Sequence, residues 1–184
     1  MKPWHLYLLE CRDGSLYAGV TTDLAARFRA HANGTGAKYT RANPPVRFAA
    51  TATFPDRSTA SRAEWQIKQL PRSKKIEWLK RAGAEAAAET IGVPLDAWQN
   101  NSALIICKLV ESGLYDGDIR SGTYLGPLAA RSRGLRPGVS HAWIKTADNQ
   151  IIDPTGWLLE GSTPRIIVTD AGSPDYQEKD AHHA

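Results

Sequence analysis

The side chains best suited to chemistry gather in the first 41 residues. An arginine can bind phosphate oxygens through two charge-assisted hydrogen bonds, and tyrosine and histidine can move protons. Hydrolysis of a phosphodiester needs an activated water and donors that stabilise charge on the phosphorus oxygens. The residues of these types in this stretch are Tyr7, Tyr17, Arg27, His31 and Tyr39.

The surrounding sequence predicts a hairpin followed by a helix. Two apolar runs, at residues 6–9 and 15–20, flank Asp13-Gly14, a pair typical of a hairpin turn. Thr21-Thr22-Asp23 then offers N-cap candidates for a helix over residues 24–31. Arg27 and His31 are four residues apart and share one face of this helix. We expect that face to meet the two tyrosines of the hairpin.

These residues carry a family resemblance over residues 3–82. Tyr7 and Tyr17-Ala18-Gly19 look like the two halves of the motif that names the GIY-YIG nuclease superfamily. The first triplet reads His5-Leu6-Tyr7, so its Gly and Ile are replaced and its Tyr is kept. The segment Gly36–Arg41 resembles the loop that follows in the family. The closest likeness is to the small bacterial stand-alone members.

The resemblance implies a metal-dependent endonuclease that hydrolyses phosphodiester bonds in DNA. Arg27 and His31 fall where the family has its helix-borne Arg and His, and Glu64 falls where it keeps a metal-binding Glu. We expect one Mg²⁺ or Mn²⁺ per site on Glu64, with water and phosphate as the other ligands. Tyr7 would be the general base, with its pKa lowered by a nearby cation. Tyr17, His31 and Tyr39 would orient water and phosphate.

Charge supports a polyanionic partner for the first half. Residues 1–82 hold 15 Lys/Arg and 6 Asp/Glu, a net charge of +9, whereas residues 83–184 hold 8 and 13, a net charge of −5. Basic side chains gain affinity for nucleic acid by releasing counterions, although a solubilising surface is an alternative explanation. We expect branched, nicked or double-stranded DNA, or RNA, as partner. A non-catalytic DNA-binding protein is the rival hypothesis.

Composition indicates a cytoplasmic protein. No apolar run approaches the ~20 residues of a membrane helix, and the N-terminus lacks a signal-peptide pattern, so we expect no membrane partner. Cys11 and Cys107 are too few and too far apart for a disulfide framework. The oligomeric state is not readable from the sequence.

The expected class is α+β, in two domains. Residues 1–82 would form a small three-stranded antiparallel sheet flanked by helices, with a third strand at 46–54 and helices at 59–69 and 73–81. Residues 83–95 form an Ala/Glu-rich linker, 96–172 a second α+β domain and 173–184 a polar tail. Five apolar residues are expected in the first core: Trp65, Ile67, Ile76, Trp78 and Leu79.

The second domain would begin with a helix at 103–112 and continue with antiparallel strands. The strands are expected at residues 119–125, 139–146, 150–153 and 165–169. We expect this domain to be an accessory or regulatory one.

Ser102, His141 and Asp153 form a second candidate constellation. A nucleophile at a helix start, then His, then Asp resembles transglutaminase-like and papain-like cysteine hydrolases, but this position holds Ser. Ser102 is a serine nucleophile, a silenced cysteine position or a plain N-cap, and His141 with Asp153 could be a structural hydrogen bond. A hydrolase or peptidase-like activity is thus a further alternative. Cys107, deeper in the helix, is expected to be a buried apolar residue.

Overall fold

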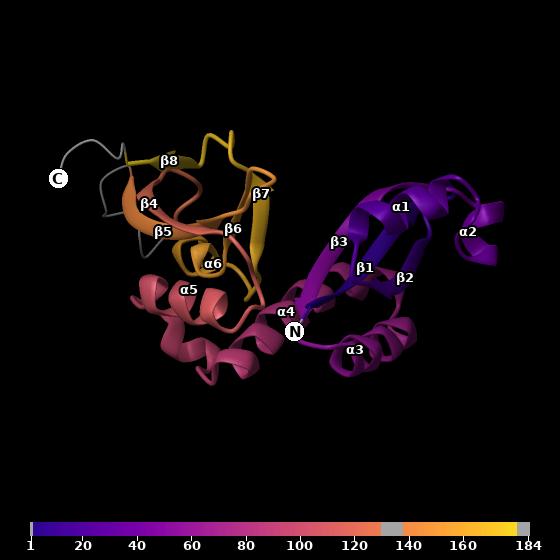
Figure 1. The fold of residues 1–184 in the computed structure, drawn as a ribbon, viewed down its shortest axis with the longest axis horizontal. Helices are drawn as coiled ribbons and strands as arrows, with labels where there is room; N and C mark the ends of the chain where they lie inside the picture. Colours follow the sequence, from indigo (N-terminus) through magenta and orange to yellow (C-terminus); the bar gives the residue numbers. More distant parts are fainter. Residues whose placement is uncertain (1, 130–137, 180–184) are drawn as a thin grey trace. The chain divides into compact units, whose positions relative to one another are not determined.

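The computed structural model describes residues 2–129 and 138–179, in two compact units (Figure 1). The units comprise Met1–Ala87 and Ala88–Ala184. The boundary falls inside the 20-residue helix α4 (Arg72–Ile91). Residues 83–91 of the expected linker are therefore helical, as Ala and Glu favour.

The first unit is built on the antiparallel sheet β2-β1-β3. The hairpin turn places Gly14 at φ +77°, a conformation that favours glycine. The expected three-stranded sheet and α+β class are confirmed. The strands are β1 (Trp4–Cys11), β2 (Leu16–Thr21) and β3 (Pro45–Phe54).

Helices cover both faces of this sheet (Figure 1). Side chains alternate along β1, so Leu6 and Leu8 pack with α3 on one face while Tyr7 contacts α1 on the other. Asp23 caps α1 by accepting a hydrogen bond from the Ala26 backbone N–H at 2.8 Å. The helices are α1 (Leu24–Ala32), α2 (Lys38–Ala42), α3 (Arg57–Gln69) and α4.

Two expectations for this unit need correction. The segment expected as a loop at Gly36–Arg41 is largely the short helix α2. Trp65 is 67% exposed, because the buried stripe of α3 runs through Ala60, Ala63 and Ile67 and leaves Trp65 on the opposite face. Ile67 and Leu79 are buried as expected, and Ile76 and Trp78 pack at the edge of the core.

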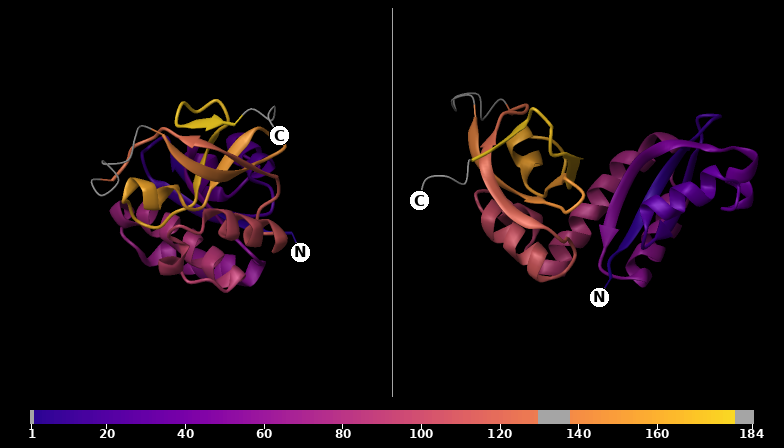
Figure 2. Two further views of the ribbon diagram at one scale, coloured as in Figure 1. Left: turned by 90° about the vertical axis from the view of Figure 1, so that its left-hand side faces the viewer. Right: turned by 45° about the horizontal axis from the view of Figure 1, so that its top comes forward.

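The second unit is a curved five-stranded antiparallel sheet of order β7-β6-β5-β4-β8 (Figure 2). Helix α5 packs against β5, and α6 lies within the curve of the sheet. The elements are the 3₁₀ helix η1 (Leu95–Trp98), α5 (Ser102–Glu111), β4 (Asp118–Tyr124), β5 (Val139–Lys145), β6 (Gln150–Asp153), α6 (Gly156–Glu160), β7 (Ile167–Asp170) and β8 (Tyr176–Glu178).

The expected polar tail is partly wrong. Residues 176–178 form β8 and pair with β4, and Tyr176 is buried against Tyr124 and Trp143. Residues 180–184 of that tail lie outside the described residues. Among the described helices, none is long and apolar enough to span a membrane.

Candidate functional site

Tyr7 is the centre of a buried polar cluster in the first unit. Its ring is fully buried in β1, and its hydroxyl meets two side chains of α1. The Arg27 Nε–H donates to Tyr7 Oη at 3.0 Å, and His31 Nε2 lies 3.0 Å from the same oxygen. Arg27 and His31 thus reach the tyrosine from one helix face, as their spacing predicted.

The second nitrogen of His31 fixes the direction of these bonds. His31 Nδ1 lies 2.6 Å from the hydroxyl of buried Thr40, which itself donates to the Ala37 carbonyl at 3.0 Å. That hydroxyl therefore accepts from Nδ1–H, which leaves Nε2 as the acceptor of the Tyr7 proton. A one-way chain of donors runs from Arg27 through Tyr7 and His31 to Thr40.

Burial determines the protonation states of Tyr7 and His31. Burial raises the pKa of Tyr7, and the hydrogen bond from Arg27 only partly opposes it, so the expected lowering of this pKa is wrong. Burial and the neighbouring Arg27 charge lower the pKa of His31. At neutral pH the resting cluster holds a protonated tyrosine beside a neutral histidine that can accept its proton.

Tyr17 and Tyr39 extend the cluster towards solvent. The Tyr17 ring lies edge-on to His31, with centroids 5.2 Å apart, and stacks on Tyr39 at 6.1 Å. Tyr39 is 47% exposed and donates to Ser15 Oγ at 2.6 Å. The structure therefore brings together all five residues expected from the hairpin, the helix and the following segment.

Glu64 acts on this cluster through its charge. It lies on α3, and its carboxylate pairs with Lys68 Nζ at 2.7 Å. Its negative charge is the smallest of several contributions to the pKa of Tyr7, and no hydrogen bond among the described residues joins it to the five. A single part-exposed carboxylate fits a magnesium ion that keeps water and phosphate as its other ligands. The described residues contain no cluster of three or more metal-ligating side chains.

Two glycines keep the cluster closely packed. A Cβ on Gly19, the last residue of the second triplet, would lie 2.6 Å from Cζ of Tyr7. A Cβ on Gly36 would lie 2.5 Å from His31 Nδ1. Only glycine lets the backbone approach both rings so closely.

Comparison with known proteins identifies the first unit. The model of the GIY-YIG catalytic domain matches residues 3–77. A UPF0213 protein of Xanthomonas campestris is 63% identical over 82 residues, which cover 80% of that protein and 45% of this chain. The chain belongs to the GIY-YIG family. This membership gives the first unit a nuclease-type fold, for which the implied substrate is nucleic acid.

Two further proteins that resemble the GIY-YIG unit share less sequence identity with it. The UPF0213 protein YhbQ of Salmonella typhimurium is 41% identical over 96 residues, which cover 96% of that protein and 52% of this chain. The solution NMR structure of the UPF0213 protein BH0048 from Bacillus halodurans is 46% identical, with a TM-score of 0.29. That match covers 44% of this chain and 86% of the other.

The second unit has its own buried histidine. His141 Nε2 lies 2.8 Å from Asp153 Oδ2, and both side chains are buried. Tyr176 donates to the same Oδ2 at 2.9 Å, and the backbone N–H groups of Thr155 and Gly156 donate to Oδ1 at 2.9 and 2.8 Å. The two oxygens of Asp153 therefore receive four hydrogen bonds.

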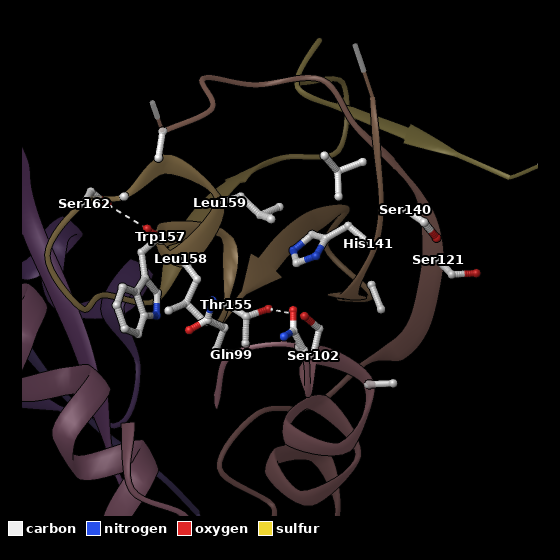
Figure 3. A pocket seen from close by; sticks show the side chains of 16 residues that line it. Gln99, Ser102, Ser121, Ser140, His141, Thr155, Trp157, Leu158, Leu159 and Ser162 are labelled. Carbon is white, nitrogen blue, oxygen red and sulfur yellow. Dashed lines mark hydrogen bonds between the residues drawn. The ribbon is translucent and has the colours of Figure 1, made fainter. Parts of the chain in front are cut away.

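Ser102 and His141 line one cavity of about 830 Å³ (Figure 3). Asn101, not Ser102, occupies the N-cap position of α5, so a cap does not explain this serine. The Ser102 hydroxyl instead accepts a hydrogen bond from Thr155 Oγ1 at 3.0 Å. Cys107, which was expected to be a buried apolar residue, is only partly buried.

Sequence reasoning missed Thr40, Thr155 and Tyr176. Thr40 lies next to Tyr39 in the segment that resembles the family, so its place in the motif was an available signal. Thr155 follows Asp153 by two residues, a spacing typical of an Asp side chain that accepts from the backbone. Tyr176 had no local signal, because its partner lies 23 residues earlier.

Proposed function

We propose that the GIY-YIG unit is a metal-dependent endonuclease that hydrolyses phosphodiester bonds in DNA, with the second unit as an accessory domain. The observation that supports this most is the one-way chain from Arg27 to Thr40. It places a single hydroxyl, that of Tyr7, between a fixed cation and a neutral base. The basic charge of this half favours an anionic substrate.

The chain suggests how water is activated. The Tyr7 hydroxyl takes a proton from the attacking water while it passes its own proton to His31 Nε2. This exchange needs no free tyrosinate, and so it fits a tyrosine whose pKa is raised by burial. Thr40 then holds the imidazolium by accepting from Nδ1–H.

Arg27 would stabilise the negative charge on the phosphate, together with a metal ion held by Glu64. The Nε–H of Arg27 is committed to Tyr7, and its terminal N–H groups are the donors available to the non-bridging oxygens. Glu64 would hold one Mg²⁺ or Mn²⁺, which supplies Lewis acidity and charge neutralisation. Tyr17 and Tyr39 would position the substrate beside the chain.

A nuclease assay on the whole protein tests this proposal. Branched, nicked and linear DNA, and matching RNA, are incubated with Mg²⁺ or Mn²⁺ and with EDTA. We expect cleavage only with metal, and a loss of about 10²-fold or more in Arg27→Ala and Glu64→Ala. Arg29→Ala on the exposed side of α1 and Glu77→Ala on α4 are matched controls that should keep the rate.

The rival DNA-binding function predicts a different pattern. Binding would be salt-dependent and would survive Arg27→Ala and Glu64→Ala almost unchanged, with no cleavage under any condition. An inactive wild type with every metal and substrate, or a fully active Glu64→Ala, would overturn the nuclease proposal.

A further inference from the structure

The cavity of the second unit contains groups that the nuclease reaction does not use. We propose that it is an acyl-transfer site in which Ser102 attacks an uncharged carboxylic ester or amide. This proposal is independent of the nuclease activity, since all its residues belong to the second unit.

Asp153 sets the tautomer of His141. Tyr176, Thr155 and Gly156 bring three O–H or N–H donors to this buried carboxylate, which acts as an acceptor. Nε2 of His141 must then carry the proton and donate it to Oδ2. The other nitrogen, Nδ1, is left as the acceptor on a ring that projects into the cavity (Figure 3). His141 is therefore fixed in the form of a general base.

Ser102 is placed as a nucleophile at the start of α5. It is the first residue of that helix, and it lines the cavity together with Ala103. The side chain of Asn101 makes no capping bond and instead donates to the Ala97 carbonyl, so it does not satisfy the first N–H groups of the helix. These N–H groups, beside the nucleophile, suit an oxyanion.

Thr155 orients the serine hydroxyl. Thr155 Oγ1 donates to Ser102 Oγ, so the hydrogen of Ser102 is free to turn towards another acceptor. Thr155 also donates its backbone N–H to Asp153. One residue thus holds both the nucleophile and the group that orients the base, which makes it a positioning residue.

The described lining of the cavity favours an uncharged substrate. The described lining residues include no Asp, Glu, Lys or Arg. They combine neutral polar groups such as Gln99 and Ser140 with apolar ones such as Trp157 and Leu158. Among the described lining residues no cation is available to replace the hydration of a phosphate, whereas the apolar side chains can pack against the acyl group of an ester or amide.

The reaction balances with water as the second substrate. Ser102 Oγ forms a bond to the carbonyl carbon while its proton moves to His141 Nδ1. Collapse of the tetrahedral intermediate breaks the bond to the leaving group, which takes that proton from His141. Water then attacks the acyl-serine by the same route, releasing a carboxylic acid and restoring Ser102.

Labelling of the full-length protein tests the nucleophile. We expect a fluorophosphonate probe to modify Ser102, as located by peptide mass spectrometry. His141→Ala should lower the labelling about 10²-fold or more, whereas Ser140→Ala, which removes an exposed serine of the same cavity, should leave it unchanged. Labelling of Ser102 that is equally fast in His141→Ala overturns the proposal, and so does an unmodified Ser102.

A cysteine at the same position gives a second readout on the folded protein. The thiol of Ser102→Cys should react with iodoacetamide at pH 6 at least about tenfold faster than that of Ser140→Cys, because His141 and the helix terminus favour the thiolate. Circular dichroism of both variants is the control for folding. Equal rates in the two variants would mean that the cavity does not activate a nucleophile.

Discussion

The two units each hold a buried histidine, and the two histidines are fixed in opposite tautomers. His31 donates from Nδ1 to a threonine hydroxyl and offers Nε2 to Tyr7. His141 donates from Nε2 to a carboxylate and leaves Nδ1 on the cavity side. In each case the partner of one nitrogen determines what the other can do.

The neighbours of each histidine match a different substrate charge. Arg27 lies beside Tyr7 and His31, and its positive charge suits a phosphodiester. The described lining around His141 carries no cation and suits a neutral carbonyl. The base in each site is the same imidazole. The surrounding charge, more than the base, therefore separates the two proposed activities.

The largest expected effect is the loss of the Asp153 carboxylate. Asp153→Ala leaves four buried donors without an acceptor, which we expect to cost about 3–5 kcal/mol of unfolding free energy. Urea denaturation measures the change in unfolding free energy. Hydrogen exchange of the native protein, read out on peptides from each unit, shows which unit is destabilised. Protection should fall in residues 138–179 and persist in the first unit. Asp116→Ala, at an exposed position, is the control.

Removing the Tyr7 hydroxyl is the matching test of the first unit. Tyr7→Phe keeps the ring contact with Phe48 but breaks the bonds to Arg27 and His31. We expect DNA cleavage to fall about 10²–10⁴-fold, with labelling of Ser102 unchanged. Tyr124→Phe removes an equally buried hydroxyl from the second unit and should not alter cleavage. Similar losses in both variants would contradict the separation of the two sites.

A smaller effect is expected at Thr40. Thr40→Val keeps the shape of the side chain but removes the hydroxyl that accepts from His31 Nδ1–H. We expect this to lower the unfolding free energy by about 1–3 kcal/mol. Cleavage should fall about tenfold because the tautomer is no longer fixed, and Thr40→Ser should restore it. If the ¹⁵N spectrum still shows a protonated Nδ1 and the rate is normal, Thr40 does not set the tautomer.

The smallest effect concerns pH. Because the pKa of His31 is lowered in the folded state, the unfolded chain binds the proton first as pH falls below 6.5. The stability that His31 contributes is thus fully present above pH 6.5 and declines below it until the folded pKa is passed. Arg27→Ala removes one cause of the lowering, so the NMR titration midpoint of His31 should rise. Arg29→Ala should leave it unchanged.

The sequence predicted those parts of the fold that depend on local signals. The turn at Asp13-Gly14, the cap at Asp23 and the spacing of Arg27 and His31 each act within a few residues. These signals, together with the family resemblance, pointed to five residues of the first candidate site. Glu64 was less accessible to this reasoning, because its face of α3 is set by packing on the sheet.

What the sequence could not give depends on contacts between distant segments. Thr155 meets Ser102 across 53 residues, and Tyr176 meets Asp153 across 23. The raised pKa of Tyr7 likewise follows from burial, which a charge count along the sequence does not measure. A short strand such as β8 has too few residues to show a period of two.

The contact between Tyr176 and Asp153 has a consequence for folding during synthesis. The residues of the hydrogen-bonded chain that runs from Arg27 through Tyr7 and His31 to Thr40 all lie within a short N-terminal segment. They therefore leave the ribosome close together in time. The four donors of Asp153 are complete only after residue 176 has been made. The second unit must therefore pass through a period in which Ser102, His141 and Asp153 have been made but Asp153 still lacks the hydrogen bond from Tyr176.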